Sequence, residues 1–417
     1  MQFRVNGGKK LHGTISVRGS KNAATPILAA TLLTREECIL SNIPLIEDVL
    51  KMIEIIEELG AKVSWKGERT VSIIARDIDP AKMDFTKVKQ MRSSILLMGA
   101  LAARVERFKM PHPGGCVIGA RPVGTHFDAL HKLGILIVQD NNFYKVNAKN
   151  AHSGEVVLRE FSVTATENVL MLAATFQEKT VIKIAATEPH VQDLCRFLRK
   201  LGVKIRGIGT HTLEIVGRKD LGGTTHTIIP DANEAATFLI MGVAAKSPII
   251  VQNAVEDHLT LVLEKLREFG ADFDITGHSI TVKPVPVLKA VSKIDARIYP
   301  GIPTDIQAPM GVLATQAEGT TLIHDTLYEG RFKYINELQR MGANAVISDP
   351  HRALITGPTP LYGKEVVSFD LRAGATMIIA ALIAEGQTVI NDAHQVDRGY
   401  ERIEERLQAI GADIERV

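Results

Sequence analysis

The chain is short of cysteine, of aromatic residues and of net charge, and each shortage excludes a class of protein. Its three cysteines, Cys38, Cys116 and Cys195, lie far apart and form no CxxC pair, which argues against a disulfide framework and against structural zinc. Aromatic residues make up 5% of the chain, so its cores must be aliphatic. A formal net charge of +2 lacks the field that proteins binding nucleic acids or membrane surfaces carry. We expect no metal and no nucleic-acid partner.

Long apolar runs are missing as well. The run at 95–103 is about half as long as a bilayer requires, and the opening MQFRVNGGKK has no apolar core of signal-peptide length. We therefore expect a cytoplasmic protein that has no membrane partner. Its 417 residues exceed the roughly 250–300 residues that one hydrophobic core serves, so two domains are expected.

One pattern recurs six times: an amphipathic helix runs into a glycine and then into a β-branched strand, as in EELGAKV and RKLGVKI. Glycine at this place accepts the left-handed backbone conformation that closes a helix. The glycines follow one another at intervals of 68 to 74 residues, at Gly60, Gly134, Gly202, Gly270, Gly342 and Gly411. This interval is too long for a solenoid repeat and predicts six small βα units.

A second helix, apolar on nearly all sides, is expected in every unit, as in ENVLMLAATF and EAATFLIMGVAA. Helices of this kind belong inside a protein, so the sheets must lie outside them. The sequence predicts an α/β fold, a two-domain inside-out α/β barrel built from six βα repeat units. Turn residues cluster at 217–231, and the first strand has no unit of its own. We therefore place one domain at 21–228 and the other at 1–20 plus 229–417.

The most distinctive segment is HPGGCVIGARPVGTH at 112–126. Its prolines and glycines predict a loop, and Cys116 stands within it. Free cysteines are most often small buried hydrophobes, which fits Cys38 and Cys195. Cys116 instead has Arg121 five residues later, and a neighbouring positive charge favours the reactive thiolate. We predict that Cys116 is a reactive thiol.

Cationic residues recur at or near predicted helix starts. They are Lys21 in GSKNAA and Arg92, Arg331, Arg372 and Arg398 in comparable segments of other units. An arginine there opposes the helix dipole, so helix stability does not explain the placement. Guanidinium groups match carboxylates and phosphates, which predicts a site for a small doubly anionic molecule. For Lys21 taken alone, the alternative is that Ser20 caps the helix and Lys21 is solvated.

These segments carry a family resemblance. SKNAA, MRSSI, PGGCVIGARPV, PTDIQA, YEGRF, DLRAGA and DRGYERIE occur in the order, and near the spacing, of the UDP-N-acetylglucosamine 1-carboxyvinyltransferases of peptidoglycan synthesis. The chain resembles this family from 1 to 417. The resemblance implies two inside-out barrels of three units each and an enzyme without a cofactor. It also implies transfer of the enolpyruvyl group of phosphoenolpyruvate to the 3′-hydroxyl of UDP-N-acetylglucosamine, with release of phosphate.

The resemblance implies catalytic roles as well. Asp305 would take the proton of the sugar hydroxyl, and Cys116 would protonate the methylene carbon of phosphoenolpyruvate, which makes the epoxide fosfomycin an expected alkylating agent of that thiol. The phosphate would bind Lys21, Arg121 and Arg398. Arg331 and Arg372 would lie near the carboxylate, with Arg92 as a support. From the residues alone, the alternative for Asp305 is that it caps the helix after IPT.

The remaining implied contacts are to the nucleotide sugar. They involve Asn22, Arg121, Pro122, Val123, Ser162, Val163 and Leu327, with Glu329 and Asp370 as polar supports. Several positions depart from the family pattern, namely Gly124, Thr125, Glu160, Thr164 and Gly330. These departures concern nucleotide contacts and leave the phosphoenolpyruvate residues unchanged.

Two other functions remain open. One is 5-enolpyruvylshikimate-3-phosphate synthase, which has the same repeat architecture but lacks the cysteine loop. The other is a catalytically silent paralogue that binds nucleotide sugar. Because the cationic residues are divided between both halves of the chain, we also expect the domains to close when the nucleotide sugar binds.

Overall fold

The protein divides into two units, each with its own buried aliphatic core. A computed structural model describes residues 1–114 and 122–417. Within these ranges the first unit comprises 19–114 and 122–229, and the second comprises Met1–Arg18 and Pro230–Val417. The N-terminal segment thus belongs with the C-terminal half of the chain. Cys116 and Arg121, two predicted site residues, lie outside the described residues.

The first unit contains the elements from α1 to β13. In chain order they are α1 (Lys21–Ala30), η1 (Thr31–Leu33), β3 (Cys38–Ser41), α2 (Glu47–Glu58), β4 (Lys62–Gly67), β5 (Thr70–Ile74), η2 (Pro80–Lys82), α3 (Phe85–Gln90), η3 (Arg92–Ile95), α4 (Leu96–Ala102), β6 (Arg107–Pro111), α5 (Gly124–His131), β7 (Leu136–Asp140), β8 (Phe143–Asn147), β9 (Glu155–Val157), α6 (Val163–Ala173), β10 (Lys179–Lys183), α7 (Pro189–Lys200), β11 (Lys204–Arg206), β12 (Thr212–Val216) and β13 (Thr224–Thr227).

The second unit contains the first two strands and everything from α8 onward. Its elements are β1 (Gln2–Asn6), β2 (Gly13–Ser16), α8 (Ala232–Ala244), β14 (Ile249–Gln252), η4 (Glu256–His258), α9 (Thr260–Glu268), β15 (Asp272–Thr276), β16 (Ser279–Lys283), β17 (Leu288–Lys289), β18 (Lys293–Ala296), α10 (Thr304–Ala314), β19 (Ala317–Asp325), α11 (Lys333–Arg340), β20 (Asn344–Asp349), β21 (Arg352–Gly357), β22 (Glu365–Val367), α12 (Leu371–Ile383), β23 (Gln387–Asn391), η5 (Ala393–Arg398), α13 (Ile403–Gln408) and β24 (Asp413–Arg416).

The sheets repeat one pairing scheme. In the order β13-β3-β5-β4, the first pair is parallel and the next two are antiparallel. The sheets β9-β10-β12-β11, β2-β14-β16-β15 and β22-β23-β1-β24 follow the same scheme. In the sheet of β19, β21 and β20, both β17 and β18 pair parallel to β19. The described strands β6, β8 and β7 form an antiparallel sheet. This regularity reflects the repeated units of the sequence.

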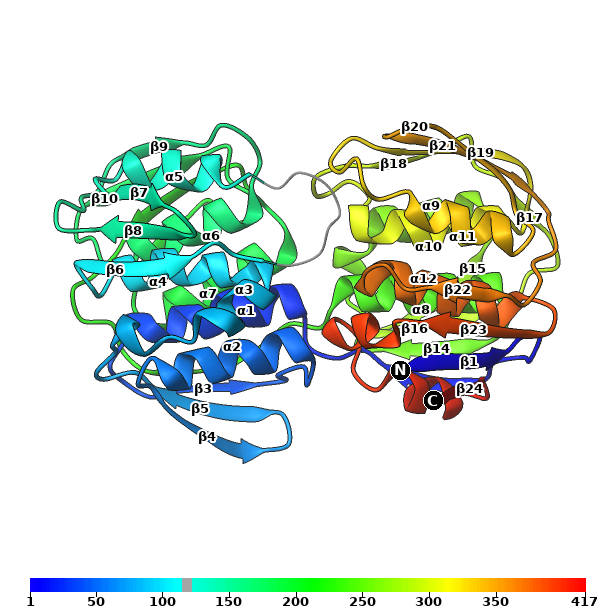
Figure 1. Ribbon diagram of the computed structural model, residues 1–417, viewed down its shortest axis with the longest axis horizontal. Helices are drawn as coiled ribbons and strands as arrows, with labels where there is room; N and C mark the ends of the chain where they lie inside the picture. The colour runs from blue at the N-terminus through cyan, green and yellow to red at the C-terminus, as the bar shows by residue number, and fades with distance from the viewer. Residues whose placement is uncertain (115–121) are drawn as a thin grey trace. The chain divides into compact units, whose positions relative to one another are not determined.

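Apolar helices fill the inside of each unit, and the sheets lie outside them (Figure 1). In α8 every residue from Glu234 to Ala244 is buried, and in α12 every residue from Arg372 to Leu382. The amphipathic α9 instead buries one side only, with Val262, Leu263 and Leu266. Because an all-round apolar helix needs cover on every side, this arrangement follows from composition. The predicted inside-out α/β fold is confirmed.

The glycines that mark the repeat have the backbone conformation expected of helix ends. All six have positive φ, between +81° at Gly134 and +108° at Gly60. Leu59, for example, closes α2 and Gly60 follows it directly. A side chain at such a position would meet the steric penalty of the left-handed region. The prediction that these six residues terminate helices is confirmed.

Two details of the helix starts differ from the prediction. The helix expected over MRSSILLMGALAA begins as the 3₁₀ segment η3, and α4 starts only at Leu96. The Ser94 hydroxyl donates to the backbone oxygens of Val88 and Met91 at 2.9 and 2.8 Å, which favours the tighter turn. Arg398 does not stand at a helix start, because it is the last residue of η5.

Every helix among the described residues is too short, or not apolar enough, to traverse a lipid bilayer.

Candidate functional site

Asp305 gathers two of the predicted arginines. It lies in the first turn of α10, and the N-cap position of this helix is occupied by Pro303. The alternative that Asp305 caps the helix is therefore wrong. Nη2 of Arg331 donates to its Oδ1 at 2.8 Å, and Nε of Arg372 donates to its Oδ2 at 3.0 Å. Arg331 precedes α11 and Arg372 is the second residue of α12. Three residues predicted from separate motifs therefore form one ion cluster within the second unit.

Both arginines of this cluster are buried. Their side chains are 9% exposed for Arg331 and 4% for Arg372. Burial opposes the charge of Arg331, but the carboxylates of Asp305 and Asp370 outweigh it and raise its pKa. Burial likewise opposes the charge of Arg372, but Tyr400 and Asp305 raise its pKa. Both side chains are therefore cationic near neutral pH.

Each guanidinium keeps hydrogen-bond donors that Asp305 does not use. Nε of Arg331 is buried and has no hydrogen-bond partner within 1–114 and 122–417. Among the described residues, Nη2 of Arg372 has no partner either, because its bonds run from Nε and Nη1. A buried donor without an acceptor, such as Nε of Arg331, is rare in folded proteins and calls for an explanation. An anionic ligand with two oxygens would supply the acceptors.

Two further carboxylates hold this region in shape. Oδ1 of Asp370 accepts the backbone amides of Arg372 and Ala373 at 2.8 and 2.9 Å, which caps α12. The fully buried Asp325 accepts the amide of Leu327 at 2.9 Å and the hydroxyl of Thr304. The predicted support Asp370 thus acts on the backbone of Arg372. The predicted contacts Leu327 and Glu329 lie in the loop that leads from Asp325 to Arg331.

Lys21 is the first residue of α1, and its charge is matched. The Ser20 hydroxyl accepts the amide of Ala23 at 3.3 Å, so the predicted cap is present. Nζ of Lys21 lies 2.6 Å from Oδ2 of Asp48, and both side chains are largely buried. The alternative of a solvated Lys21 is therefore wrong. Asn22 follows in the same helix.

Other predicted residues of the first unit stand at element starts. Ser162 caps α6 by accepting the amide of Ala165 at 3.4 Å, and Val163 is the first residue of that helix. Pro122 and Val123 directly precede α5, and Arg92 begins η3. In the second unit, Nη1 of Arg398 lies 3.4 Å from Oε1 of Gln395.

Three of the positions that depart from the family pattern take part in side-chain hydrogen bonds. The Thr125 hydroxyl donates to Oε1 of Glu160 at 2.7 Å. Nε2 of His126 lies 2.7 Å from the hydroxyl of Thr164. These two bonds tie the start of α5 to the segment before α6 and to the first turn of α6. Thr125 and Glu160 are thus a bonded pair, which their separation of 35 positions in the sequence does not suggest.

Sequence reasoning missed several partners of the site. Asp48 pairs with Lys21, Asn233 donates to Oδ2 of Asp305 at 3.4 Å, and Tyr400 accepts a hydrogen bond from Arg372 at 2.9 Å. Tyr400 lies within DRGYERIE, two residues after Arg398. Asp48 and Asn233 stand in the first turns of α2 and α8, but no local signal separates them from ordinary helix-start residues.

The two described cysteines are inert. Cys38 and Cys195 are buried, and burial raises the pKa of each thiol to about 12. Neither forms an appreciable amount of thiolate near neutral pH. Their prediction as buried hydrophobes is confirmed. Residues 1–114 and 122–417 contain no group of three His, Cys, Asp or Glu side chains that could hold a metal ion.

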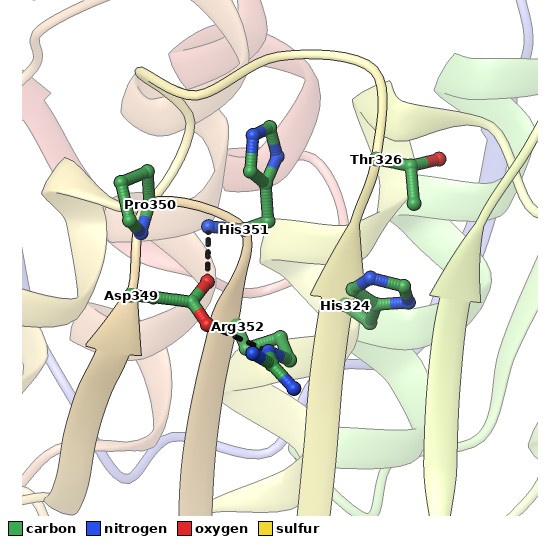
Figure 2. Close-up of a pocket in the computed structure, with 6 residues that line it drawn as sticks. All are labelled: His324, Thr326, Asp349, Pro350, His351 and Arg352. Atoms are coloured by element: carbon green, nitrogen blue, oxygen red, sulfur yellow. Dashed lines mark hydrogen bonds and ion pairs between the residues drawn. The ribbon is translucent and has the colours of Figure 1, made fainter.

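A separate hollow of about 400 Å³ lies at the ends of β19 to β21 (Figure 2). Its lining consists of His324, Thr326, Asp349, Pro350, His351 and Arg352. Nε of Arg352 donates to Oδ2 of Asp349 at 2.6 Å, and Nδ1 of His351 lies 2.6 Å from the backbone oxygen of Asp325. None of the predicted site residues lines this hollow.

Comparisons with known proteins agree with the motifs. Residues 5–407 match the EPSP synthase (3-phosphoshikimate 1-carboxyvinyltransferase) family. A UDP-N-acetylglucosamine 1-carboxyvinyltransferase of Koribacter versatilis is 41% identical over 100% of this chain and 96% of its own length. The UDP-N-acetylglucosamine 1-carboxyvinyltransferase 1 of Caldanaerobacter subterraneus is 42% identical over 100% of this chain and 99% of its own length.

Solved structures of enolpyruvyl transferases are similar to this chain as well. The enolpyruvyl transferase NikO of Streptomyces tendae has a TM-score of 0.90 and 25% identity, covering 100% of this chain and 98% of its own. EPSP synthase of Acinetobacter baumannii, at 18% identity, has a TM-score of 0.77 over 100% of both chains, which indicates a common fold. On the full-length identity to the curated relatives, the chain belongs to the UDP-N-acetylglucosamine 1-carboxyvinyltransferase family of enolpyruvyl transferases.

Proposed function

We propose that this enzyme transfers the enolpyruvyl group of phosphoenolpyruvate to the 3′-hydroxyl of UDP-N-acetylglucosamine and releases phosphate. The observation that carries the proposal is the identity of about 40% to relatives of that name over the whole chain. The ion cluster of Asp305, Arg331 and Arg372 supports it, because it combines a carboxylate with two buried cations. This reaction is the first committed step of peptidoglycan synthesis, and we place it in the cytoplasm.

The chemistry needs an acid, a base and fixed cations. Protonation of C3 of phosphoenolpyruvate makes C2 electrophilic, and the 3′-oxygen of the sugar adds there as its proton leaves. The resulting tetrahedral ketal loses phosphate from C2 and a proton from C3, which restores the double bond. We assign Cys116 as the acid and Asp305 as the base. Lys21, Arg121 and Arg398 would hold the phosphate, as fixed charges that need no reorganisation during reaction.

We assign the carboxylate of phosphoenolpyruvate to the second unit. Among the described residues, Nε of Arg331 and Nη2 of Arg372 are donors that no protein acceptor occupies. A carboxylate bound to them would lie beside the Asp305 side chain, since both arginines already contact it. Asp305 would then be held by the same cations that hold the substrate, which favours a defined distance between base and electrophile.

The nucleotide-sugar contacts follow the motifs of the first unit and one loop of the second. We assign them to Asn22, Arg121, Pro122, Val123, Ser162, Val163 and Leu327, with Asp370 and Glu329 as polar supports of the site and Arg92 as a support of the cleft. The bonded pairs Thr125–Glu160 and His126–Thr164 lie within three positions of Val123 and Ser162 in the sequence. We therefore expect this part of the nucleotide site to differ in detail from that of other family members.

A phosphate-release assay tests the proposal. Phosphoenolpyruvate is offered with UDP-N-acetylglucosamine in one arm and with shikimate 3-phosphate in the other. We expect release in the first arm only. Release in the second arm alone would establish the EPSP synthase activity, whose name the family match and two structural neighbours carry. Calorimetric binding of the nucleotide sugar without release in either arm would identify a silent paralogue.

A further inference from the structure

Tyr400 lies behind Arg372 and is completely buried, although it carries a hydroxyl. It follows η5 by two residues, and its side chain is among the largest that are fully enclosed. Nη1 of Arg372 lies 2.9 Å from its hydroxyl oxygen, and Oγ1 of Thr237 lies 2.9 Å from the same atom. The hydroxyl therefore joins α12 to α8.

The Tyr400 hydroxyl accepts one of these hydrogen bonds and donates the other. An arginine only donates, so the Tyr400 oxygen accepts from Arg372. The Thr237 hydroxyl donates to the backbone oxygen of Asn233 at 2.8 Å, so it accepts the proton of Tyr400. Burial raises the pKa of the Tyr400 phenol even though Arg372 acts against this rise. The phenol is thus neutral, and its single proton is donated to Oγ1 of Thr237.

These hydrogen bonds form a closed ring that includes Asp305, Arg372, Tyr400, Thr237 and Asn233. Arg372 donates to Tyr400 and, through Nε, to Asp305. The side chain of Asn233 donates to the same Oδ2 of Asp305 at 3.4 Å, and its backbone oxygen accepts from Thr237. Four segments contribute, namely α8, α10, α12 and the turn after η5. A ring with every direction defined allows one arrangement of the guanidinium plane.

We propose that Tyr400 is a positioning residue, which orients the Arg372 guanidinium so that its free Nη2 faces the carboxylate of the substrate. Two of the three nitrogens are anchored, Nε on Asp305 and Nη1 on Tyr400. The guanidinium carbon also lies 5.2 Å from the centre of the Tyr400 ring, which restricts rotation further. The inference rests on the proposed function, because that function supplies the carboxylate.

Tyr400→Phe isolates the hydroxyl from the ring. The variant keeps the aromatic volume but loses the acceptor for Nη1. We expect the KM for phosphoenolpyruvate to rise about tenfold, as for the loss of one hydrogen bond to a charged group. The dissociation constant of UDP-N-acetylglucosamine, measured by calorimetry, should stay within about twofold. In an Arg372→Lys background the same substitution should have no further effect on the KM, because the anchored nitrogen is absent.

Tyr334→Phe is the matched control. Tyr334 is equally buried in the same unit, and its hydroxyl donates to Oε1 of Gln307 at 3.0 Å, with no guanidinium involved. Both variants should lose similar stability, but only Tyr400→Phe should raise the KM for phosphoenolpyruvate. An unchanged KM in Tyr400→Phe, or an equal rise in both variants, would overturn the proposal.

A second measurement separates this inference from the proposed function. In protein labelled with ¹⁵N-arginine, the guanidinium signals of Arg372 are identified by their loss in Arg372→Lys. We expect resolved Nη signals in the parent, because rotation about the Cζ–Nη bonds is restricted, and averaged signals in Tyr400→Phe. Signals that are identical in both proteins would sink the proposal even if the enzyme is active. Inactivity of the parent with resolved signals would instead count against the proposed function alone.

Discussion

At the scale of single residues, Asp305 carries both chemistry and stability. Replacement by Ala should abolish turnover, because a base acts in the transition state, whereas the affinity for UDP-N-acetylglucosamine should stay within about tenfold. Ala would also leave two buried guanidinium groups without their carboxylate. We therefore expect lower stability for Asp305→Ala than for Asp305→Asn, which keeps an acceptor oxygen. Phosphate release and urea unfolding measure the two effects, and near-normal turnover in a folded Asn variant would remove Asp305 from the mechanism.

Thiol reactivity should be confined to Cys116. Burial and a pKa of about 12 protect Cys38 and Cys195, so brief treatment with fosfomycin should modify Cys116 alone. The nucleotide sugar should accelerate this modification. Peptide mass spectrometry locates the adduct, and an adduct mainly on Cys38 or Cys195 would contradict the assignment. Cys116→Asp keeps a proton donor and should retain activity while alkylation is lost, whereas Cys116→Ser should be impaired.

Glu167, which has no role in the proposed mechanism, should make the folding stability depend on pH. It is buried in α6, and burial, helped by Glu188, raises the pKa of its carboxyl well above 4.5. Below pH 4.5 the group is protonated in both states and has no effect. As the pH rises, the unfolded chain ionises while the folded chain keeps the proton, so stability falls by at most about 1.4 kcal/mol per pH unit.

Glu167→Gln removes this titration. The gain in unfolding free energy relative to the parent should be larger at pH 8 than at pH 5, as measured by urea unfolding. Glu264→Gln, at an exposed position of α9, serves as the control and should show no such trend. An equal difference at both pH values for Glu167→Gln would show that the buried carboxyl does not retain its proton.

At the scale of elements, close approach of α4 and α6 depends on a glycine. A Cβ atom on Gly99 would lie 2.4 Å from the backbone oxygen of Asn168, and the Gly99 amide donates to the side chain of Asn168 at 2.7 Å. Gly99→Ala should therefore lower stability by about 1–3 kcal/mol, as overpacking does. Gly124→Ala at the start of α5 meets open space and should be neutral or slightly stabilising. Equal unfolding midpoints for the two variants would show that the helices can move apart at no cost.

At the scale of the whole molecule, the first strand completes the second unit. β1 lies between β23 and β24, and Phe3 is fully buried with the Arg416 guanidinium 4.8 Å from its ring centre. Phe3→Ala should cost about 3–5 kcal/mol and should reduce hydrogen-exchange protection in 230–417. Protection in 19–229 should stay unchanged, because that unit has a separate core. Phe197→Ala, buried in α7, should show the reverse, and loss of protection throughout in either variant would contradict independent cores.

The sequence by itself determined the parts of this protein that depend on short-range patterns. Glycine at a helix end and an all-round apolar helix are each specified within a few residues, because backbone conformation and burial respond to local chemistry. Six copies of that pattern sufficed for the α/β architecture. The motifs likewise sufficed for the family, to which the relatives are 41% and 42% identical. The roles of Cys116, Lys21 and Arg398 remain predictions.

Only the tertiary structure decided which side chains share a site. Arg372 meets Asp305 across 67 positions of the chain, and Thr237 meets Tyr400 across 163. The pairing of Lys21 with Asp48 and the contact of Thr125 with Glu160 are equally invisible in a local pattern. No periodicity encodes such pairs, because a hydrogen bond depends on distance and direction in space and not on spacing along the chain. The helices that bring these groups together are fixed by the burial of their apolar sides, and the polar partners meet as a consequence.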